Sequence, residues 1–136
     1  MADWYGTSRS NYVKIKDMDA LNKALEPWCI NTEADLHGRI AFFARDSDNG
    51  GWPSWAQDAE GNEIEFEWET VICPHMEDGE ILVIRSVGAE KLRYVTGHAA
   101  AFDNTGKSIS LSLDLIYSMA ANHFGVPEAN ITTAEY

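Results

Sequence analysis

The stretch ILVIRSVGAEKLRYVTGHAAAFDNTGKSISLSL, residues 81–113, decides the fold. It begins with a continuous apolar run at 81–84 and contains a second strand-like run at 92–102. The turn-forming residues Asp103 to Gly106 then lead into a third strand at 108–113. Strands that are joined by such short turns pair in antiparallel fashion. The stretch therefore predicts an antiparallel sheet built from consecutive hairpins.

The residues that follow this stretch predict a C-terminal helix over about 114–124. Apolar side chains recur there at intervals of three and four residues and so share one stripe of a helix. These are Leu115, Met119, Ala120 and either His123 or Phe124. Gly125 and Pro127 come directly afterwards, as is typical of the end of a helix.

Upstream, the pattern predicts a strand at 11–16 and then a helix at about 17–27. Apolar and polar residues alternate in the first segment, which is typical of a strand. Asp17 is a suitable N-cap for the second segment, and Pro27 closes it. The apolar residues at helical spacing are Met18, Leu21, Leu25 and Trp28.

Shorter strand-like segments fill the middle of the chain, at 29–36, 39–45, 54–57 and 63–68, with a short helix expected near 70–76. The turn formers at 58–62 make the last two strands a hairpin. The order of strand, helix, several strands and helix predicts an α+β fold. With 136 residues and no linker or repeat, we expect one domain over 1–136, with a mostly antiparallel sheet and two main helices.

Negative charge is concentrated in residues 46–80, which hold eleven carboxylates and no Lys or Arg. The acids are Asp46, Asp48, Asp58, Glu60, Glu63, Glu65, Glu67, Glu69, Glu77, Asp78 and Glu80. The chain has a formal net charge of -12, so this segment supplies nearly all of it. Such a segment repels nucleic acid and membrane phosphates and attracts basic partners. We therefore expect neither direct nucleic-acid binding nor membrane binding.

Residues 63–69 alternate strictly between glutamate and an apolar residue. On a strand, this period of two places Glu63, Glu65, Glu67 and Glu69 in one evenly spaced row, backed by Ile64, Phe66 and Trp68. A helix over the same residues is the alternative, although Gly61 and Pro74 leave it little room. The row is either a binding surface or a solvated outer face of the sheet. The alternation alone slightly favours the solvated face, whereas the absence of Lys and Arg supports the binding surface, because solvated faces usually mix both signs.

Two tryptophans, Trp52 and Trp55, flank Pro53 at the start of this acidic hairpin. Exposed tryptophan beside charge is typical of residues that dominate the energy of protein interfaces. The alternative is that both rings cover the core from a loop.

No motif for catalysis, metal binding or cofactor binding is present in the sequence. The four histidines lack the spacing of zinc ligands, and Cys29 and Cys73 are far apart with no base indicated for either. The many acids make any acid–base pair uninformative. The N-terminus lacks the pattern of a signal peptide, and no apolar run approaches the ~20 residues of a membrane span. We therefore expect a soluble cytoplasmic protein that is not an enzyme and has no cofactor.

Three stretches, WYGTSRSNY at 4–12, GGWPS at 50–54 and GAEKLRY at 88–94, resemble small acidic proteins carried by phages and other mobile elements. The resemblance covers most of the chain and implies no chemistry for any residue. It implies a setting, because many such proteins inhibit host defence, either by imitating DNA or by blocking a protein surface. This chain differs from the uniformly acidic helical DNA mimics, since its charge lies in one segment. Local blockade of a basic site in a bacterial host cell is therefore expected.

Two hypotheses for function remain open at this point. In the first, the acidic surface blocks a basic, nucleic-acid-binding site on a host defence protein. The residues expected to bind that partner are Asp46, Asp48, Trp52, Trp55, Asp58, Glu60, Glu63, Glu65, Glu67 and Glu69. In the second, an accessory domain binds a protein or small ligand through the Trp52–Trp55 loop, and the acids serve only solubility. The sequence leaves the oligomeric state open.

Overall fold

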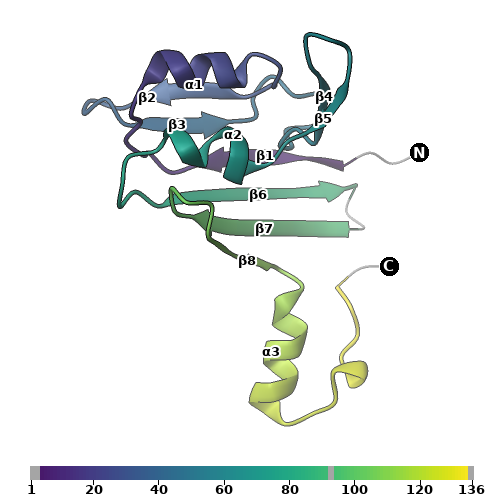
Figure 1. Cartoon of the computed structure of the whole chain (residues 1–136). Coiled ribbons are helices and arrows are strands. Elements are labelled where there is room, and N and C mark those ends of the chain that lie inside the picture. Colours follow the sequence, from purple (N-terminus) through teal and green to yellow (C-terminus); the bar gives the residue numbers. More distant parts are fainter. Residues whose placement is uncertain (1–3, 92–93, 135–136) are drawn as a thin grey trace.

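The computed structural model describes residues 4–91 and 94–134. Its main feature is a six-stranded antiparallel sheet (Figure 1). The strand order is β2-β3-β1-β6-β7-β8, and every neighbouring pair is antiparallel. The strands are β1 (Trp4–Ser10), β2 (Asn31–Ala34), β3 (Ile40–Phe43), β6 (Leu82–Glu90), β7 (Tyr94–Phe102) and β8 (Ser108–Ser112). The predicted single α+β domain with a mostly antiparallel sheet is confirmed.

The hairpins predicted from residues 81–113 form the centre and one edge of the sheet. β6 and β7 pair along nine residues each, from Leu82 opposite Phe102 to Glu90 opposite Tyr94. The β7–β8 turn is closed by the Asp103 carboxylate, which accepts hydrogen bonds from the backbone N–H groups of Thr105 and Lys107. The start of the predicted strand at 92–102 falls on residues 92–93, which lie outside the described residues.

The prediction of a strand at 11–16 is wrong, because the strand that joins the sheet is β1, which ends at Ser10. Val13 and Ile15 make only isolated bridges, to Ile40 and Met76. β1 itself, WYGTSRS, lacks an apolar alternation. Its place between β3 and β6 is set by long-range pairing, which local periodicity does not report.

Packing around Trp4 explains the glycines at positions 6 and 88. A Cβ atom at Gly6 or Gly88 would overlap the Trp4 ring, and one at Gly51 would lie 3.3 Å from it. The indole N–H of Trp4 donates to the Thr96 hydroxyl at 2.8 Å. Three stretches far apart in sequence, around residues 6, 51 and 88, therefore meet at one ring.

The first predicted helix is confirmed as α1 (Met18–Leu25), with Asp17 as its N-cap. The Asp17 carboxylate accepts hydrogen bonds from the N–H groups of Asp19 and Ala20, at 3.0 and 3.4 Å. Leu21 and Leu25 are buried and belong to the core. Figure 1 shows α1 beside β2 and β3, at the upper end of the sheet.

A two-stranded hairpin, β4 (Trp55–Gln57) and β5 (Glu63–Glu65), connects the upper part of the sheet to α2 (Trp68–Val71) and the 3₁₀ turn η1 (Cys73–His75). The hairpin and the short helical segment predicted near 70–76 are thus both present. Trp68 is the hub of the core, and its ring meets four other aromatic rings, those of Phe42, Trp52, Phe66 and Phe102.

The last predicted helix is confirmed as α3 (Leu115–Phe124), followed by the 3₁₀ turn η2 (Glu128–Asn130). Gly125 caps α3 in the left-handed conformation, at φ +65°. The apolar stripe does not face the core, however, and no residue of this fully described helix is buried. Figure 1 shows α3 extending past the β8 edge, away from the rest of the domain. Within the described residues, no helix is both long and apolar enough to cross a membrane.

Candidate functional site

The carboxylates of residues 46–80 are displayed to solvent without counter-charges. Nine of the eleven are exposed, and Asp58 and Glu80 are half-buried. None forms an ion pair with a described residue, whereas Asp35 and Glu33, outside the segment, pair with Arg39 and Arg45 at 2.7 Å. The negative charge inferred from composition is therefore an unneutralised surface charge.

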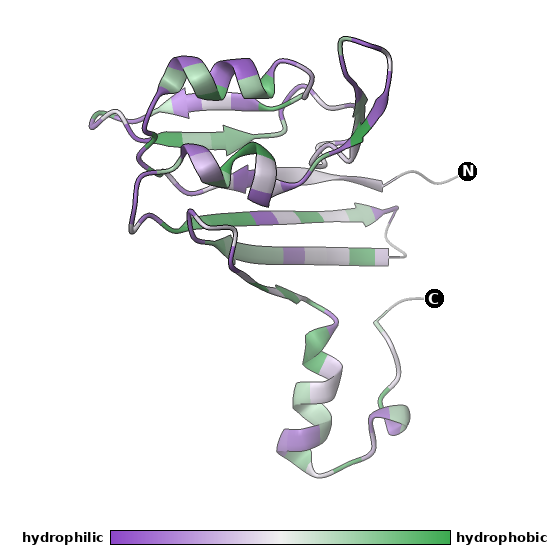
Figure 2. Ribbon diagram, in the orientation of Figure 1, coloured by the Kyte–Doolittle hydropathy of each residue, from purple (hydrophilic) through white to green (hydrophobic). Residues whose placement is uncertain are grey.

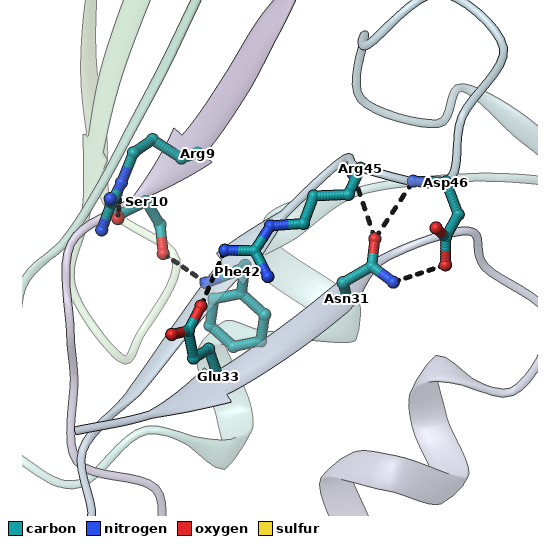
Figure 3. Close-up of polar contacts among 7 residues, drawn as sticks. All are labelled: Arg9, Ser10, Asn31, Glu33, Phe42, Arg45 and Asp46. Carbon is teal, nitrogen blue, oxygen red and sulfur yellow. Dashed lines mark hydrogen bonds and ion pairs between the residues drawn. The ribbon is translucent and has the colours of Figure 1, made fainter. Parts of the chain in front are cut away.

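Some of these carboxylates hold the local backbone. Asp58 accepts hydrogen bonds from the N–H groups of Glu60 and Asn62, both at 2.9 Å, and so closes the β4–β5 turn. Asp46 accepts a bond of 2.6 Å from the Asn31 amide, whose oxygen accepts from the N–H groups of Arg45 and Asp46 (Figure 3). Asn31 of β2 thus holds Asp46 and the backbone that follows β3 in place.

The four glutamates at 63–69 have no side-chain hydrogen bond to any described residue. The predicted continuous strand is wrong, since β5 ends at Glu65 and α2 begins at Trp68. Beyond β5 the contact with the facing strand continues only through the Phe66 N–H, which donates to the Ser54 carbonyl at 2.8 Å. Glu67 instead becomes the N-cap residue of α2, so the four carboxylates do not form one evenly spaced row.

The alternation of exposure survives this change of backbone. Every second residue, Glu63, Glu65, Glu67 and Glu69, is exposed, while Phe66 and Trp68 are buried and Ile64 packs against the core. The period of two correctly indicated which side chains face inward. It did not require a ladder over the whole segment, because an extended loop and the first residue of a helix can present the same alternation.

The hairpin has an outer face that combines aromatic and acidic residues. Trp55 lies directly opposite Glu65, and Gln57 lies directly opposite Glu63. All four are exposed, whereas Ala56 and Ile64 between them pack against the core. We call these four residues the acidic hairpin face. Gln57 was not among the predicted site residues, although the length of the 58–62 turn sets its register opposite Glu63.

The structure separates the two tryptophans that the sequence placed together. The Trp52 ring is half-buried and packs edge-to-face on Trp68, with ring centroids 4.8 Å apart. Its indole nitrogen is buried and has no partner among the described residues. Trp55, in contrast, is 63% exposed. Only Trp55 is therefore available for a large aromatic contact with a partner.

Other parts of the described chain offer little chemistry. A cavity of about 380 Å³ lies between Trp52 and the β6–β8 strands and is lined by small and polar side chains such as Ser86, His98 and Ser110. Burial, together with the negative charges of Glu69 and Asp103, raises the pKa of the Cys73 thiol to about 11. Cys73 is therefore a neutral core residue at physiological pH. Among the described residues, no three His, Cys, Asp or Glu side chains converge to hold a metal ion.

Comparisons with protein-family models, with curated proteins and with solved structures each found no match for this chain. The resemblance to small acidic proteins of mobile elements therefore stays an expectation. Function has to be inferred from the chain's own residues, and the most distinctive surface that they form is the acidic hairpin face.

Proposed function

We propose that this protein is a non-catalytic binding protein whose acidic hairpin face occupies a basic, nucleic-acid-binding site on another protein. The observation that carries the proposal is the outer face of β4–β5, where an exposed Trp55 lies opposite Glu65, with Glu63 next on the same face, and neither carboxylate has a counter-ion among the described residues. Tryptophan at a contact centre and complementary charge around it are the usual composition of a strong protein interface.

Electrostatics define the kind of partner. The segment 46–80 carries eleven carboxylates and no Lys or Arg, and such negative charge raises the encounter rate with a positively charged groove and disfavours acidic surfaces. Grooves that bind nucleic acid are lined with Lys and Arg and so meet this requirement. The expected setting among mobile-element proteins makes a nucleic-acid-binding complex of bacterial defence, in the host cytoplasm, the partner class that we propose to test first.

A second function is favoured by one observation, the 63% exposure of Trp55 beside a well-packed Trp52. In this alternative, Trp55 supplies the binding energy for a protein or small ligand, and the glutamates only keep the protein soluble. The two functions differ in their dependence on salt, because exposed charges are screened strongly above about 0.1 M.

Affinity capture with matched variants tests the proposal. Immobilised wild type, the double variant Glu63→Gln/Glu65→Gln and the control Asp19→Asn/Glu26→Gln are exposed to nuclease-treated bacterial lysate. The control removes the same charge from exposed positions of α1 and its C-cap, far from β5 in sequence. At about 0.05 M salt, we expect wild type and control to retain a basic nucleic-acid-binding protein and the Glu variant to retain about tenfold less.

If the Glu63→Gln/Glu65→Gln variant retains as much partner as wild type does, at low salt and at high salt, the proposed electrostatic contact is contradicted. If that variant retains the partner while Trp55→Ala loses it, the second function is correct.

A further inference from the structure

Exposed apolar side chains are concentrated in the C-terminal limb, which we define as residues 108–126, comprising β8, α3 and the residues that flank α3. Eight of the fourteen large hydrophobic residues that are exposed in the described chain lie in this limb. They are Ile109, Leu111, Leu113, Leu115, Ile116, Met119, Phe124 and Val126. Figure 2 shows α3 mainly in the colours of apolar and neutral residues. Monomeric proteins rarely expose contiguous apolar surface of this extent.

The helix α3 carries none of the charged residues that usually cover the solvated side of a helix. Its ten residues, LIYSMAANHF, include no Asp, Glu, Lys or Arg, yet none of them is buried. A helix that is apolar around most of its circumference is normally covered by other elements. The unmet requirement of this helix is burial of its apolar side chains.

The neighbouring strand β8 is an open edge. It pairs with β7 on one side, and no other described strand pairs with its second side. The bond from the Leu113 N–H to the Gly97 carbonyl fixes the phase of the ladder, so the backbone groups of Ser110 and Ser112 point to the open side. Proteins protect such edges with charge, proline or bulges, and residues 108–113 contain neither charge nor proline.

The total surface indicates how much area is left uncovered. The chain exposes 9186 Å². A folded monomer of 15.2 kDa is expected to expose roughly 7,100 Å², so the excess is about 2,000 Å². Obligate dimers bury about 1,000–2,500 Å² on each subunit. The excess area matches what one subunit of a stable dimer covers.

We propose that the C-terminal limb binds the same limb of a second copy of this chain, in a two-fold dimer. An antiparallel β8–β8 contact is self-complementary, as a two-fold axis requires, and it would continue the sheet from one copy into the other. The helix α3 already extends past the β8 edge (Figure 1), into the space on the side where the second copy's sheet would lie. There, its apolar side chains would meet the exposed apolar residues of the partner's limb.

The distribution of charge also favours a second copy at this surface. Two chains of net charge -12 repel each other, so a contact between copies must lie where charge is low. The limb contains a single charged residue, Asp114, and lies outside the acidic segment 46–80. A basic partner would instead be drawn to the acidic hairpin face, so the dimer and the proposed function use different surfaces.

Sedimentation velocity over a range of concentrations up to about 0.1 mM tests this proposal. We expect wild type to sediment as two chains, about 30 kDa, or twice 15.2 kDa. The variant Ile109→Lys/Leu111→Lys should raise the dissociation constant at least about 100-fold and sediment as one chain. Both side chains are exposed in the single chain, at 75% and 54%, so the substitution should not disturb its fold. The control Leu36→Lys alters an exposed leucine between β2 and β3, outside the C-terminal limb, and should remain dimeric.

The proposal is overturned if wild type sediments as a single chain, or if Ile109→Lys/Leu111→Lys dimerises as wild type does. If far-ultraviolet circular dichroism shows that this variant is unfolded, Met119→Lys on α3 decides. A folded, monomeric Met119→Lys protein supports the proposal, and one that dimerises like wild type overturns it. Added salt screens the repulsion between copies and should tighten the dimer, whereas it should weaken binding to a basic partner. Failure of one proposal is therefore distinguishable from failure of the other.

Discussion

Replacing Trp68 with alanine is expected to lower the free energy of unfolding by about 3–5 kcal/mol. The Trp68 side chain is only 8% exposed, and its ring lies 4.8 Å from Trp52 and 4.9 Å from Phe66, centroid to centroid. Truncation to alanine opens a cavity between rings that come from the sheet, the hairpin and the loop before the hairpin. Because those rings belong to a rigid framework, we expect them to fill the cavity only in part.

Urea unfolding measures this loss, with wild type and variant compared at the same protein concentration because self-association adds to apparent stability. Trp55→Ala is the matched control, since it removes the same side chain from an exposed position and should cost less than about 0.5 kcal/mol. A loss below about 1 kcal/mol for Trp68→Ala would show that the aromatic cluster is not the centre of the core.

Unlike Trp68→Ala, the variant Trp55→Ala is expected to lose much of its affinity for the partner while its free energy of unfolding stays unchanged. Interface tryptophans that act as anchors cost about 2 kcal/mol or more when they are truncated, which is a loss of roughly 30-fold in affinity. The ring is solvated in the free protein and contributes no buried contact to the core, so its removal should leave the urea midpoint in place. Isothermal titration calorimetry with the captured partner measures the affinity.

Two substitutions calibrate the Trp55 result. Trp55→Tyr keeps a rigid aromatic ring at the position opposite Glu65 and should retain most of the affinity. Gln57→Ala removes an uncharged side chain from the same face and should change the affinity less than threefold, roughly the spread of near-neutral interface contacts. If Trp55→Ala binds the partner as tightly as wild type does, Trp55 is not an anchor, and the proposed contact depends on charge alone.

The parts of the fold that could be predicted from sequence are those set by local chemistry. Asp17 and Gly125 mark helix ends because their side-chain and backbone preferences act within a few residues. The turn around Asp103 is likewise local, as its carboxylate bonds to the N–H groups of residues 105 and 107. The β7–β8 hairpin follows from this turn.

Long-range contacts account for what was missed. β1 is a strand because β3 and β6 lie on either side of it, and its Gly6 leaves room for the Trp4 ring, whereas the strand follows no apolar period. The strand at 63–69 ends at Glu65, and the chain enters α2 at Trp68, whose ring packs in the core. The apolar stripe of α3 was predicted correctly as a pattern. A pattern does not specify which surface will cover it, and the described part of the chain leaves no residue of α3 buried.

The candidate site divides in the same way. Exposure of the glutamates at 63–69 follows directly from their alternation with apolar residues. Trp52 is half-buried because its ring packs on Trp68, whereas Trp55 is exposed. The local sequence around the two tryptophans does not show which of them reaches Trp68. The structure therefore narrows the ten predicted binding residues to a face in which Trp55, Glu63 and Glu65 lie side by side.

Displacement of nucleic acid tests the central claim most directly. The basic protein recovered by capture is loaded with fluorescently labelled nucleic acid, and this chain is titrated in while anisotropy is recorded. We predict that wild type lowers the anisotropy to that of the free probe, and that Glu63→Gln/Glu65→Gln requires about tenfold more protein to do so. An anisotropy that stays constant or rises on addition of wild type would show that both ligands bind together, which contradicts occupation of the nucleic-acid site by the acidic hairpin face.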